Sequence, residues 1–182
     1  FVIGTGFNNT VNYIIQDSNG KYVVVGNFTS YNGTTQNRIC RLNQNGTLDD
    51  TFVGGGCSST VLSIIEDSNH KYVVNGYFTQ YDGSSAGRIC RINQDGSMDE
   101  TFTIGTGFNQ VTTKIIEDSN HKYVVVGAFT SYRGTARSRI ARINQDGSLD
   151  TSFNMGLNTG GGKVIIENSN NQYIFGGTIT PN

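Results

Sequence analysis

The stretch DSNHKYVVNGYFTQYDG at residues 67–83 occurs elsewhere in the chain with few changes. Residues 17–33 read DSNGKYVVVGNFTSYNG, residues 118–134 read DSNHKYVVVGAFTSYRG, and a looser version, NSNNQYIFGGTITPN, occupies residues 168–182. The starting positions make the repeat about 50 residues long, and an internal period of that length indicates a tandem-repeat architecture.

Each copy contains two extended runs around a polar turn. In the third copy the turn is DSNH at 118–121, and Asp, Ser and Asn favour tight turns. The run that follows, YVVVGAF at 123–129, is β-branched and aromatic, which predicts a strand. Both alternating faces of this strand are mostly apolar, so we expect a sheet that is covered on both sides. The recurrent Gly127 indicates close approach of another backbone or a large side chain.

A second hairpin follows in each copy. The segments are RICRLNQNGTLDDTF at 38–52, RICRINQDGSMDETF at 88–102 and RIARINQDGSLDTSF at 139–153. Asn-Gly and Asp-Gly between alternating residues are strong hairpin signals. A two-residue turn at Asn-Gly or Asp-Gly predicts that an Arg faces an acidic residue across the strands in two copies and a Thr in the third. The predicted partners are Arg41 with Asp50, Arg91 with Glu100, and Arg142 with Thr151.

Four short strands in about 50 residues match the size of one β-propeller blade. The chain is therefore predicted to be an all-β propeller segment of about three and a half four-stranded antiparallel blades. Residues 1–182 form one such segment, with blade boundaries near 1–52, 53–102 and 103–153 and an incomplete blade at 154–182. A β-helix is the main alternative, although its coils are usually shorter.

The ends of the repeats suggest what surrounds this segment. Phe1 aligns with Phe52, Phe102 and Phe153, so the chain is expected to begin at the end of one blade and to stop after two strands of another. Open end blades would expose strand edges and apolar faces. We therefore expect further blades of the same protein, or other chains, as partners that complete the ring.

The third copy, SNHKYVVVGAFTSYRG followed by RIARINQDGSLDTSF, resembles the delta-60 repeat, a β-propeller-like repeat of bacterial and phage proteins. The resemblance covers nearly the whole chain and is most specific at the second hairpin. It is weaker at the first turn, where the family favours Asp-Gly. This chain has Asn19-Gly20, Asn69-His70, Asn120-His121 and Asn170-Asn171 there. The resemblance implies a propeller scaffold in large extracellular, surface or virion proteins and brings no catalytic residues.

Composition argues against several classes of partner. Charged residues make up 15% of the chain and the net charge is −1, with 13 Lys and Arg residues spread along the repeats, so no nucleic-acid partner is expected. No apolar run reaches the roughly 18 residues of a membrane span, so no membrane insertion is expected. Cys40, Cys57 and Cys90 are interpreted as unpaired packing residues.

No catalytic, cofactor-binding or metal-binding residue is predicted. His70 and His121 occupy equivalent turn positions and are interpreted as exposed turn residues rather than metal ligands. The segment NQDGSLD at 144–150 has spaced oxygen ligands that could suggest calcium, but it lacks the EF-hand spacing and a hairpin turn explains it better.

The Tyr-x-Gly loops are the candidate binding sites. They keep a constant frame around a variable middle residue, as a loop-based binding face would. The candidate residues are Tyr31, Asn32, Tyr81, Asp82, Tyr132 and Arg133. The alternative is that Tyr packs, Gly turns and the middle residue is only solvated.

These features predict a non-enzymatic structural and recognition module. The expected setting is a phage tail or fibre appendage or a bacterial surface protein, located outside the cell or on the virion surface. The blade loops would bind a cell-surface glycan or a receptor protein. Two alternatives stay open: a glycan-active enzyme whose site lies in blades not present here, and a pure assembly module whose open ends bind identical neighbours.

Overall fold

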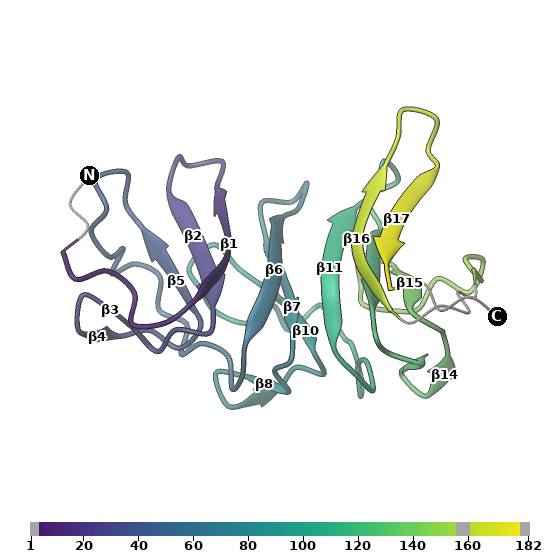
Figure 1. Ribbon diagram of the computed structural model, residues 1–182, viewed down its shortest axis with the longest axis horizontal. Helices are drawn as coiled ribbons and strands as arrows, with labels where there is room; N and C mark the ends of the chain where they lie inside the picture. Colours follow the sequence, from purple (N-terminus) through teal and green to yellow (C-terminus); the bar gives the residue numbers. More distant parts are fainter. Residues whose placement is uncertain (1–3, 156–160, 179–182) are drawn as a thin grey trace.

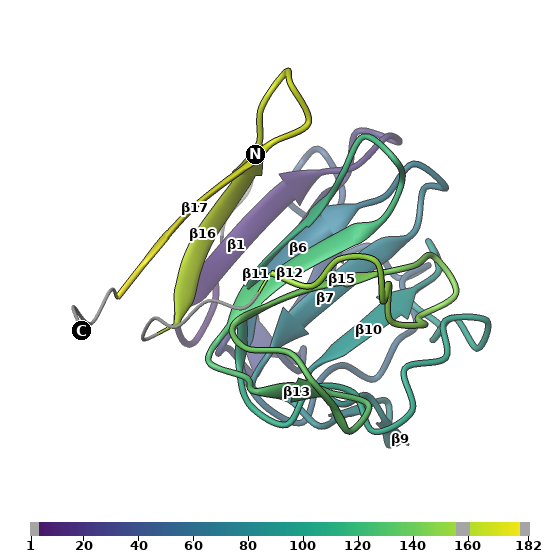
Figure 2. The ribbon, with the colours of Figure 1, turned by 90° about the vertical axis from the view of Figure 1, so that its right-hand side faces the viewer.

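The computed structural model describes residues 4–155 and 161–178, and within them every regular element is a β-strand (Figure 1). Four antiparallel sheets follow one another along the chain, with their first strands β1, β6, β11 and β16 side by side. Turning the molecule shows the other strands of each sheet extending away from this inner row (Figure 2). The sheets therefore radiate from a common side, which confirms the all-β, propeller-type fold.

The first sheet contains β1 (Val11–Gln16), β2 (Tyr22–Gly26) and β5 (Ile39–Leu42), and the second contains β6 (Val61–Glu66), β7 (Tyr72–Gly76) and β10 (Ile89–Ile92). The third contains β11 (Thr112–Glu117), β12 (Tyr123–Gly127) and β15 (Ile140–Ile143), and the fourth contains β16 (Gly162–Glu167) and β17 (Tyr173–Gly177). Three small ribbons complete the set: β3 (Ser30–Tyr31) with β4 (Thr34–Thr35), β8 (Gln80–Tyr81) with β9 (Ser84–Ser85), and β13 (Ser131–Tyr132) with β14 (Thr135–Ala136).

The fourth strand of each predicted blade is much shorter than expected. It is reduced to one bridge per sheet: Leu42 with Leu48, Ile92 with Met98, and Ile143 with Leu149. The chain turns away directly afterwards, because Phe52 N donates to the Asp49 carbonyl at 3.1 Å. The predicted alignment of Phe1 with the residues that follow these turns concerns a residue outside the described range.

The predicted register of the second hairpin is wrong by one residue. Asn43 N donates to Thr47 O at 2.9 Å, and Asp49 N donates to Arg41 O at 2.9 Å, so the loop comprises residues 44–46. Its last residue, Gly46, has φ of 88°, as expected for a longer hairpin loop that ends in a left-handed residue. Arg41 therefore pairs with Asp49 and not with Asp50, and the third copy also has its ion pair. The Nε–Oδ2 distances are 2.6 Å for Arg41–Asp49, 2.7 Å for Arg91–Asp99 and 2.8 Å for Arg142–Asp150.

The sheets stack through two chemically different faces. One, the tyrosine face, carries Tyr72, Val74, Phe78 and Ile64 in the second sheet. The other, the valine face, carries Val23, Val25 and Ile39 in the first sheet. These two sets form one buried cluster, and the same combination recurs between the second and third sheets and between the third and fourth. The prediction that both faces are covered is confirmed at these three joints.

The recurrent strand glycine has the close neighbour that was predicted for it. A Cβ on Gly76 would lie 2.3 Å from the Thr60 carbonyl oxygen, at the point where the register of β6 and β7 shifts between Val61 and Ser63. The equivalent glycines, Gly26, Gly127 and Gly177, have the same relation to a backbone carbonyl. A side chain at this position would prevent the first strand from pairing closely with the second.

Buried polar side chains link each sheet to the next. Between the second and third sheets, the Arg91 guanidinium donates to Asp99 at 2.7 Å, to the Tyr123 hydroxyl at 3.1 Å and to the Gln145 carbonyl at 2.6 Å. Tyr123 in turn donates to Asp67 Oδ2 at 2.5 Å. We call these residues, together with Lys71, the polar lock. Its counterpart at the first joint contains Asp17, Tyr72, Arg41, Asp49 and Lys21.

Hydrogen bonds from cationic and hydroxyl groups keep Asp99 of the polar lock ionised. Burial alone would raise the pKa of Asp99, but hydrogen bonds from Lys71, Thr101 and Arg91 outweigh it and hold that pKa well below its usual range. Burial raises the pKa of Tyr123, and its hydrogen bond to Asp67 raises it further, so the hydroxyl remains a donor. The polar lock orients two sheets because Arg91 of the second sheet donates to Tyr123 and Gln145 of the third, and Tyr123 donates back to Asp67 of the second.

One pair of buried polar side chains in the second sheet has no hydrogen-bond partners among the described residues. Asn75 is fully buried, and within the described residues neither atom of its amide has a hydrogen-bond partner. Its cross-strand neighbour Ser63 is equally buried, with an unpaired hydroxyl. The corresponding residues of the first and third sheets are Val25 and Val126, which pack in apolar clusters.

Replacing Asn75 with valine is therefore expected to stabilise the protein by about 1–3 kcal/mol, the usual cost of a buried unsatisfied polar group. Urea unfolding followed by circular dichroism measures the change. The reverse substitution in the third sheet, Val126→Asn, is the matched control and should destabilise the protein by a similar amount. A fall in stability on N75V would show that the amide makes a stabilising interaction.

Candidate binding site at the blade loops

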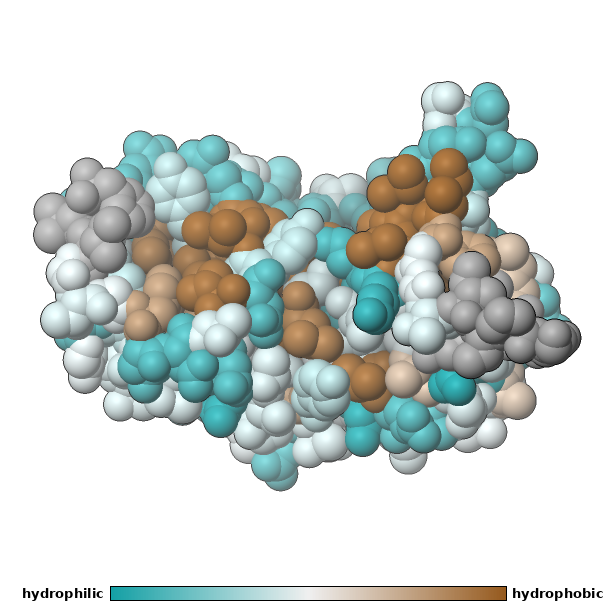
Figure 3. Space-filling view, in the orientation of Figure 1, coloured by the Kyte–Doolittle hydropathy of each residue, from teal (hydrophilic) through white to brown (hydrophobic). Residues whose placement is uncertain are grey.

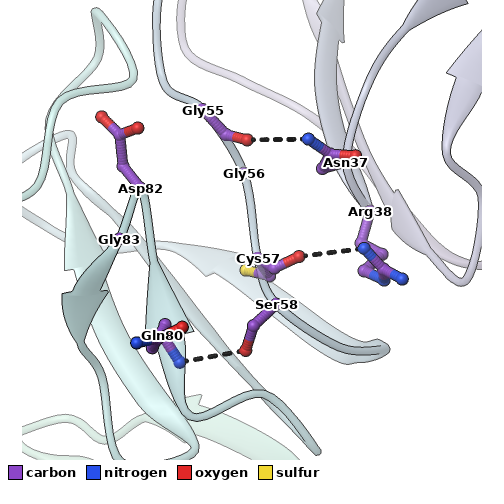
Figure 4. A pocket seen from close by; sticks show the side chains of 9 residues that line it. All are labelled: Asn37, Arg38, Gly55, Gly56, Cys57, Ser58, Gln80, Asp82 and Gly83. Atoms are coloured by element: carbon purple, nitrogen blue, oxygen red, sulfur yellow. Dashed lines mark hydrogen bonds between the residues drawn. The ribbon is translucent and has the colours of Figure 1, made fainter.

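The Tyr-x-Gly loops lie at one end of the sheets, at the turns of the small ribbons. A pocket of about 300 Å³ opens beside the loop of the second sheet, against the segment that joins the first sheet to the second (Figure 4). Its lining residues are Asn37, Arg38, Gly55, Gly56, Cys57, Ser58, Gln80, Asp82 and Gly83. The pocket therefore sits at the joint between two sheets, where loops from both meet.

The loop tyrosines are not exposed binding residues, which corrects that part of the prediction. Tyr31, Tyr81 and Tyr132 are buried, and each hydroxyl donates to the carbonyl of the hairpin-loop glycine in its own repeat. The distances to Gly46 O, Gly96 O and Gly147 O are 2.7, 2.5 and 2.6 Å. The tyrosines join the two loops of a repeat and hold the Tyr-x-Gly frame rigid.

The middle residues of the loops are exposed and differ in charge. Asn32, Asp82 and Arg133 have φ of 47°, 48° and 50°, a left-handed conformation that Asn and Asp tolerate well. Asn32 Oδ1 accepts from Gly6 N at 2.8 Å, and Arg133 donates to Thr103 O at 3.2 Å. A neutral, a negative and a positive side chain thus occupy the same place on one rigid frame. Their role as binding residues stays a prediction.

Asp82 is the middle residue that borders the pocket. Its backbone N donates to Gly56 O at 2.9 Å, which ties the loop to the linking segment. Its carboxylate lies over Gly55, where a Cβ would be 2.1 Å from Oδ1. Within residues 4–155 and 161–178, the structure shows no hydrogen bond to this carboxylate. Because Asp82 is also exposed, its oxygens are free to accept hydrogen bonds from a ligand.

The opposite wall comes from the first sheet. Arg38 has φ of 67° and donates from Nη1 to Cys57 O at 3.2 Å, while Asn37 donates to Gly55 O at 3.2 Å (Figure 4). Ser58 Oγ accepts from Gln80 N at 3.1 Å and so fixes the floor. The pocket consequently combines a cation, a carboxylate and two side-chain amides on an ordered frame.

Sequence reasoning found Asp82 but missed Arg38 and Asn37. The sequence did contain a signal for Arg38, because an Arg opens the second hairpin of all three repeats. In the structure Arg38, Arg88 and Arg139 share a left-handed backbone, with φ of 67°, 67° and 69°. Arg88 donates to Phe108 O at 2.8 Å in the same way. The equivalent place at the second joint has a different lining, because Gly87 replaces Asn37 and Arg133 replaces Asp82.

The histidines are exposed turn residues, as predicted. His70 and His121 have φ of 59° and 58° and lie 3.4 Å from the carboxylates of Glu66 and Glu117. In the NQDG segments, Asp95 Oδ1 accepts from Ser97 N at 2.9 Å and from Ser97 Oγ at 2.6 Å, which is the hydrogen bonding of a turn. In the described part of the chain, no group of three His, Cys, Asp or Glu side chains is placed to hold a metal ion.

The cysteines are free and buried, as predicted. Burial raises the pKa of the Cys40 thiol to about 12, so it remains protonated at neutral pH. Cys57 pairs with Tyr81 in an isolated bridge, as Phe7 does with Tyr31 and Phe108 with Tyr132, which makes it a packing residue behind the pocket. Among the described residues there is also no helix long and apolar enough to span a membrane.

Comparisons with known proteins add to this description. A family model described as "Domain of unknown function (DUF5122) beta-propeller" matches residues 18–52, 68–102 and 119–153. No curated protein sequence matches the chain. Among solved structures, one titled "Crystal Structure of the extracellular domain of the putative hybrid two component system BT3049 from B. thetaiotaomicron" shares 12% sequence identity with this chain, with a TM-score of 0.48. That similarity covers 92% of this chain and 25% of the other, so the chain spans about a quarter of that structure.

Proposed function

Since the chain belongs to the β-propeller family described as domain of unknown function DUF5122, we propose that it is a non-enzymatic structural and recognition module. It would act in an extracellular or virion-surface protein, such as a phage tail or fibre appendage or a bacterial surface protein. The resemblance to delta-60 repeats supports this setting. Its blade loops would present polar ligand-binding residues on a scaffold held rigid by the buried tyrosines.

The observation that carries the proposal is the pocket beside Asp82. It brings together a carboxylate without a hydrogen-bond partner among the described residues, a guanidinium and two amides, on a frame with several backbone hydrogen bonds. Such a set offers both donors and acceptors in fixed directions. Neighbouring hydroxyl groups of a neutral glycan need this mixture, because each hydroxyl both donates and accepts. We therefore favour a neutral glycan as the ligand of this pocket.

Glycan-array binding of the intact chain, followed by titration of the best ligand, tests this function. Asp82→Asn keeps the left-handed turn, since Asn32 adopts the same φ in the first repeat, but it removes the charge. The substitution replaces one of the two acceptor oxygens with an NH2 donor, so the loss of that acceptor and of the charge should weaken binding by about tenfold or more. The matched control, Asp50→Asn, changes an exposed Asp outside the pocket and should leave affinity unchanged.

Absence of any glycan ligand, or equal affinity of the wild type and D82N, would exclude glycan binding at this pocket. A receptor protein would then be the remaining ligand class. Mass spectrometry of the bound glycan after long incubation tests the non-enzymatic part of the proposal, because an enzyme would shorten the glycan.

A further inference from the structure

Two sheet faces at the ends of the described chain lack the partner that equivalent faces have inside it. At all three internal joints, the valine face of one sheet packs against the tyrosine face of the next. The tyrosine face of the first sheet and the valine face of the last sheet have no such neighbour within residues 4–155 and 161–178. These two open faces are of opposite kinds, so they have the same relation to each other as the two sides of every internal joint.

The exposure of matched residues shows which part of each face is open. On the first sheet, Ile14 is 55% exposed, whereas its counterparts in the other sheets are buried. Those counterparts, Ile64, Ile115 and Ile165, are 0%, 0% and 2% exposed. On the last sheet, Ile174 is 56% exposed, whereas Val23, Val73 and Val124 at the same position are fully buried. Val11 beside Ile14, and Val164 and Ile166 beside Ile174, enlarge the two patches.

Both patches lie on the same side of the molecule. In the space-filling view, apolar surface gathers over β1 and again over β16 and β17, with a hollow between them at the upper edge (Figure 3). Isolated exposed apolar residues are common on proteins, but patches centred on residues whose counterparts are core in the other sheets, as Ile14 and Ile174 are, indicate an interface. A second molecule can therefore approach both patches from one direction.

The polar side chains that form a hydrogen bond at the edge of each internal joint have counterparts on both open faces. Inside the chain, Glu66 accepts hydrogen bonds from Ser18 N and Oγ at 2.7 and 2.6 Å, and the two later joints repeat this contact. The positions left over at the ends are Gln16 on the first sheet and Ser169 on the last, and both are exposed. Gln has one acceptor oxygen where Glu has two, so this pair can form one of the two hydrogen bonds of the contact.

We propose that copies of this chain associate head to tail, with the tyrosine face of the first sheet of one copy covering the valine face of the last sheet of the next. The occupant of each open face is thus a second copy, since that copy carries a face of the type that covers the equivalent residues at three joints. Such a heterologous contact gives a closed assembly if its rotation closes and a longer one if it does not. The association is independent of ligand binding at the loops.

The test measures the mass of the intact chain by light scattering after size exclusion, across a range of concentrations. The wild type is expected to self-associate. Ile14→Asp and Ile174→Asp each place a charge in the joint and should weaken self-association by about tenfold or more. Because both residues are exposed, the variants should keep the wild-type circular dichroism and thermal midpoint. Val53→Asp, at a 69% exposed apolar position away from both open faces, is the control and should associate normally.

Mixing the two variants distinguishes head-to-tail association from other modes. I14D retains an intact valine face and I174D retains an intact tyrosine face, so the mixture should form a one-to-one complex that neither variant forms alone. A short bis-maleimide should also link copies of the double variant Gln16→Cys, Ser169→Cys. A monomeric wild type, or a variant that still self-associates as strongly as the wild type, would overturn the proposal.

Discussion

Replacing Arg91 with methionine is expected to destabilise the protein by about 3–5 kcal/mol, the usual result of removing one partner of a buried ion pair. Methionine keeps much of the apolar stem of arginine, so the substitution removes mainly the contacts of the guanidinium. Asp99 and the Gln145 carbonyl each lose a donor, and Tyr123 loses the contact to its oxygen. Equilibrium unfolding in urea measures the change directly.

The matched control is Arg133→Met. Arg133 is exposed and makes one hydrogen bond to Thr103 O, so its loss should change stability by less than about 0.5 kcal/mol.

The pH dependence of stability provides a second check. The folded-state pKa of Asp99 is depressed, so the stabilisation is present above the unfolded value near 3.8 and is lost as pH falls below it. The difference between wild type and R91M should therefore shrink in acid, and a difference that stays below 1 kcal/mol at neutral pH would contradict the lock.

Gly76→Ala is expected to destabilise the protein by about 3 kcal/mol, at the upper end of what overpacking costs. The added Cβ would lie 2.3 Å from Thr60 O and 3.0 Å from Leu62 N, and both are backbone atoms that cannot move without breaking the pairing of β6 with β7. The expected result is a lower urea midpoint together with faster amide exchange in β6, which lines the inner side of the sheets.

Gly83→Ala separates steric crowding from backbone strain. Nothing lies within 4 Å of a Cβ at Gly83, but its φ is +79°, so alanine there should cost only about 1–2 kcal/mol. Gly76 has an ordinary φ, and its cost would therefore come from the close approach alone. If Gly76→Ala proved as mild as a surface substitution, the first strand would have room to move away from the second.

Much of the fold could be predicted because the signals are local. The alternation of YVVVG predicts strands that are buried on both faces, and the four sheets have this pattern at β2, β7, β12 and, more loosely, β17. The glycine that ends each of these strands also fitted its predicted role. The register of the second hairpin could not be predicted from the sequence, because Asn-Gly and Asp-Gly occur in hairpin loops of several lengths. A change of one residue in the loop length moves the cross-strand partner of Arg41 from Asp50 to Asp49.

The candidate site was only partly predictable. Asp82 was found from the constant frame of the Tyr-x-Gly loop, whereas Arg38 and Asn37 belong to the previous repeat and meet Asp82 only where two sheets pack. The tyrosines were included as candidates because they belong to the constant Tyr-x-Gly frame of the candidate loops. Their burial depends on the carbonyl of a glycine in a second loop of the same repeat, which the loop sequence does not reveal.

Local sequence patterns established the repeat length, the first two strands of each sheet with their apolar faces, and the approximate positions of the turns, because these follow from neighbours within a few residues and from the two-residue period of a strand. The tertiary structure decided which side chains meet across joints. Tyr72 reaches Asp17 and Tyr123 reaches Asp67 over more than one full repeat. Such contacts depend on how one sheet is rotated against the next, and that rotation is set by packing of both faces together rather than by any local pattern.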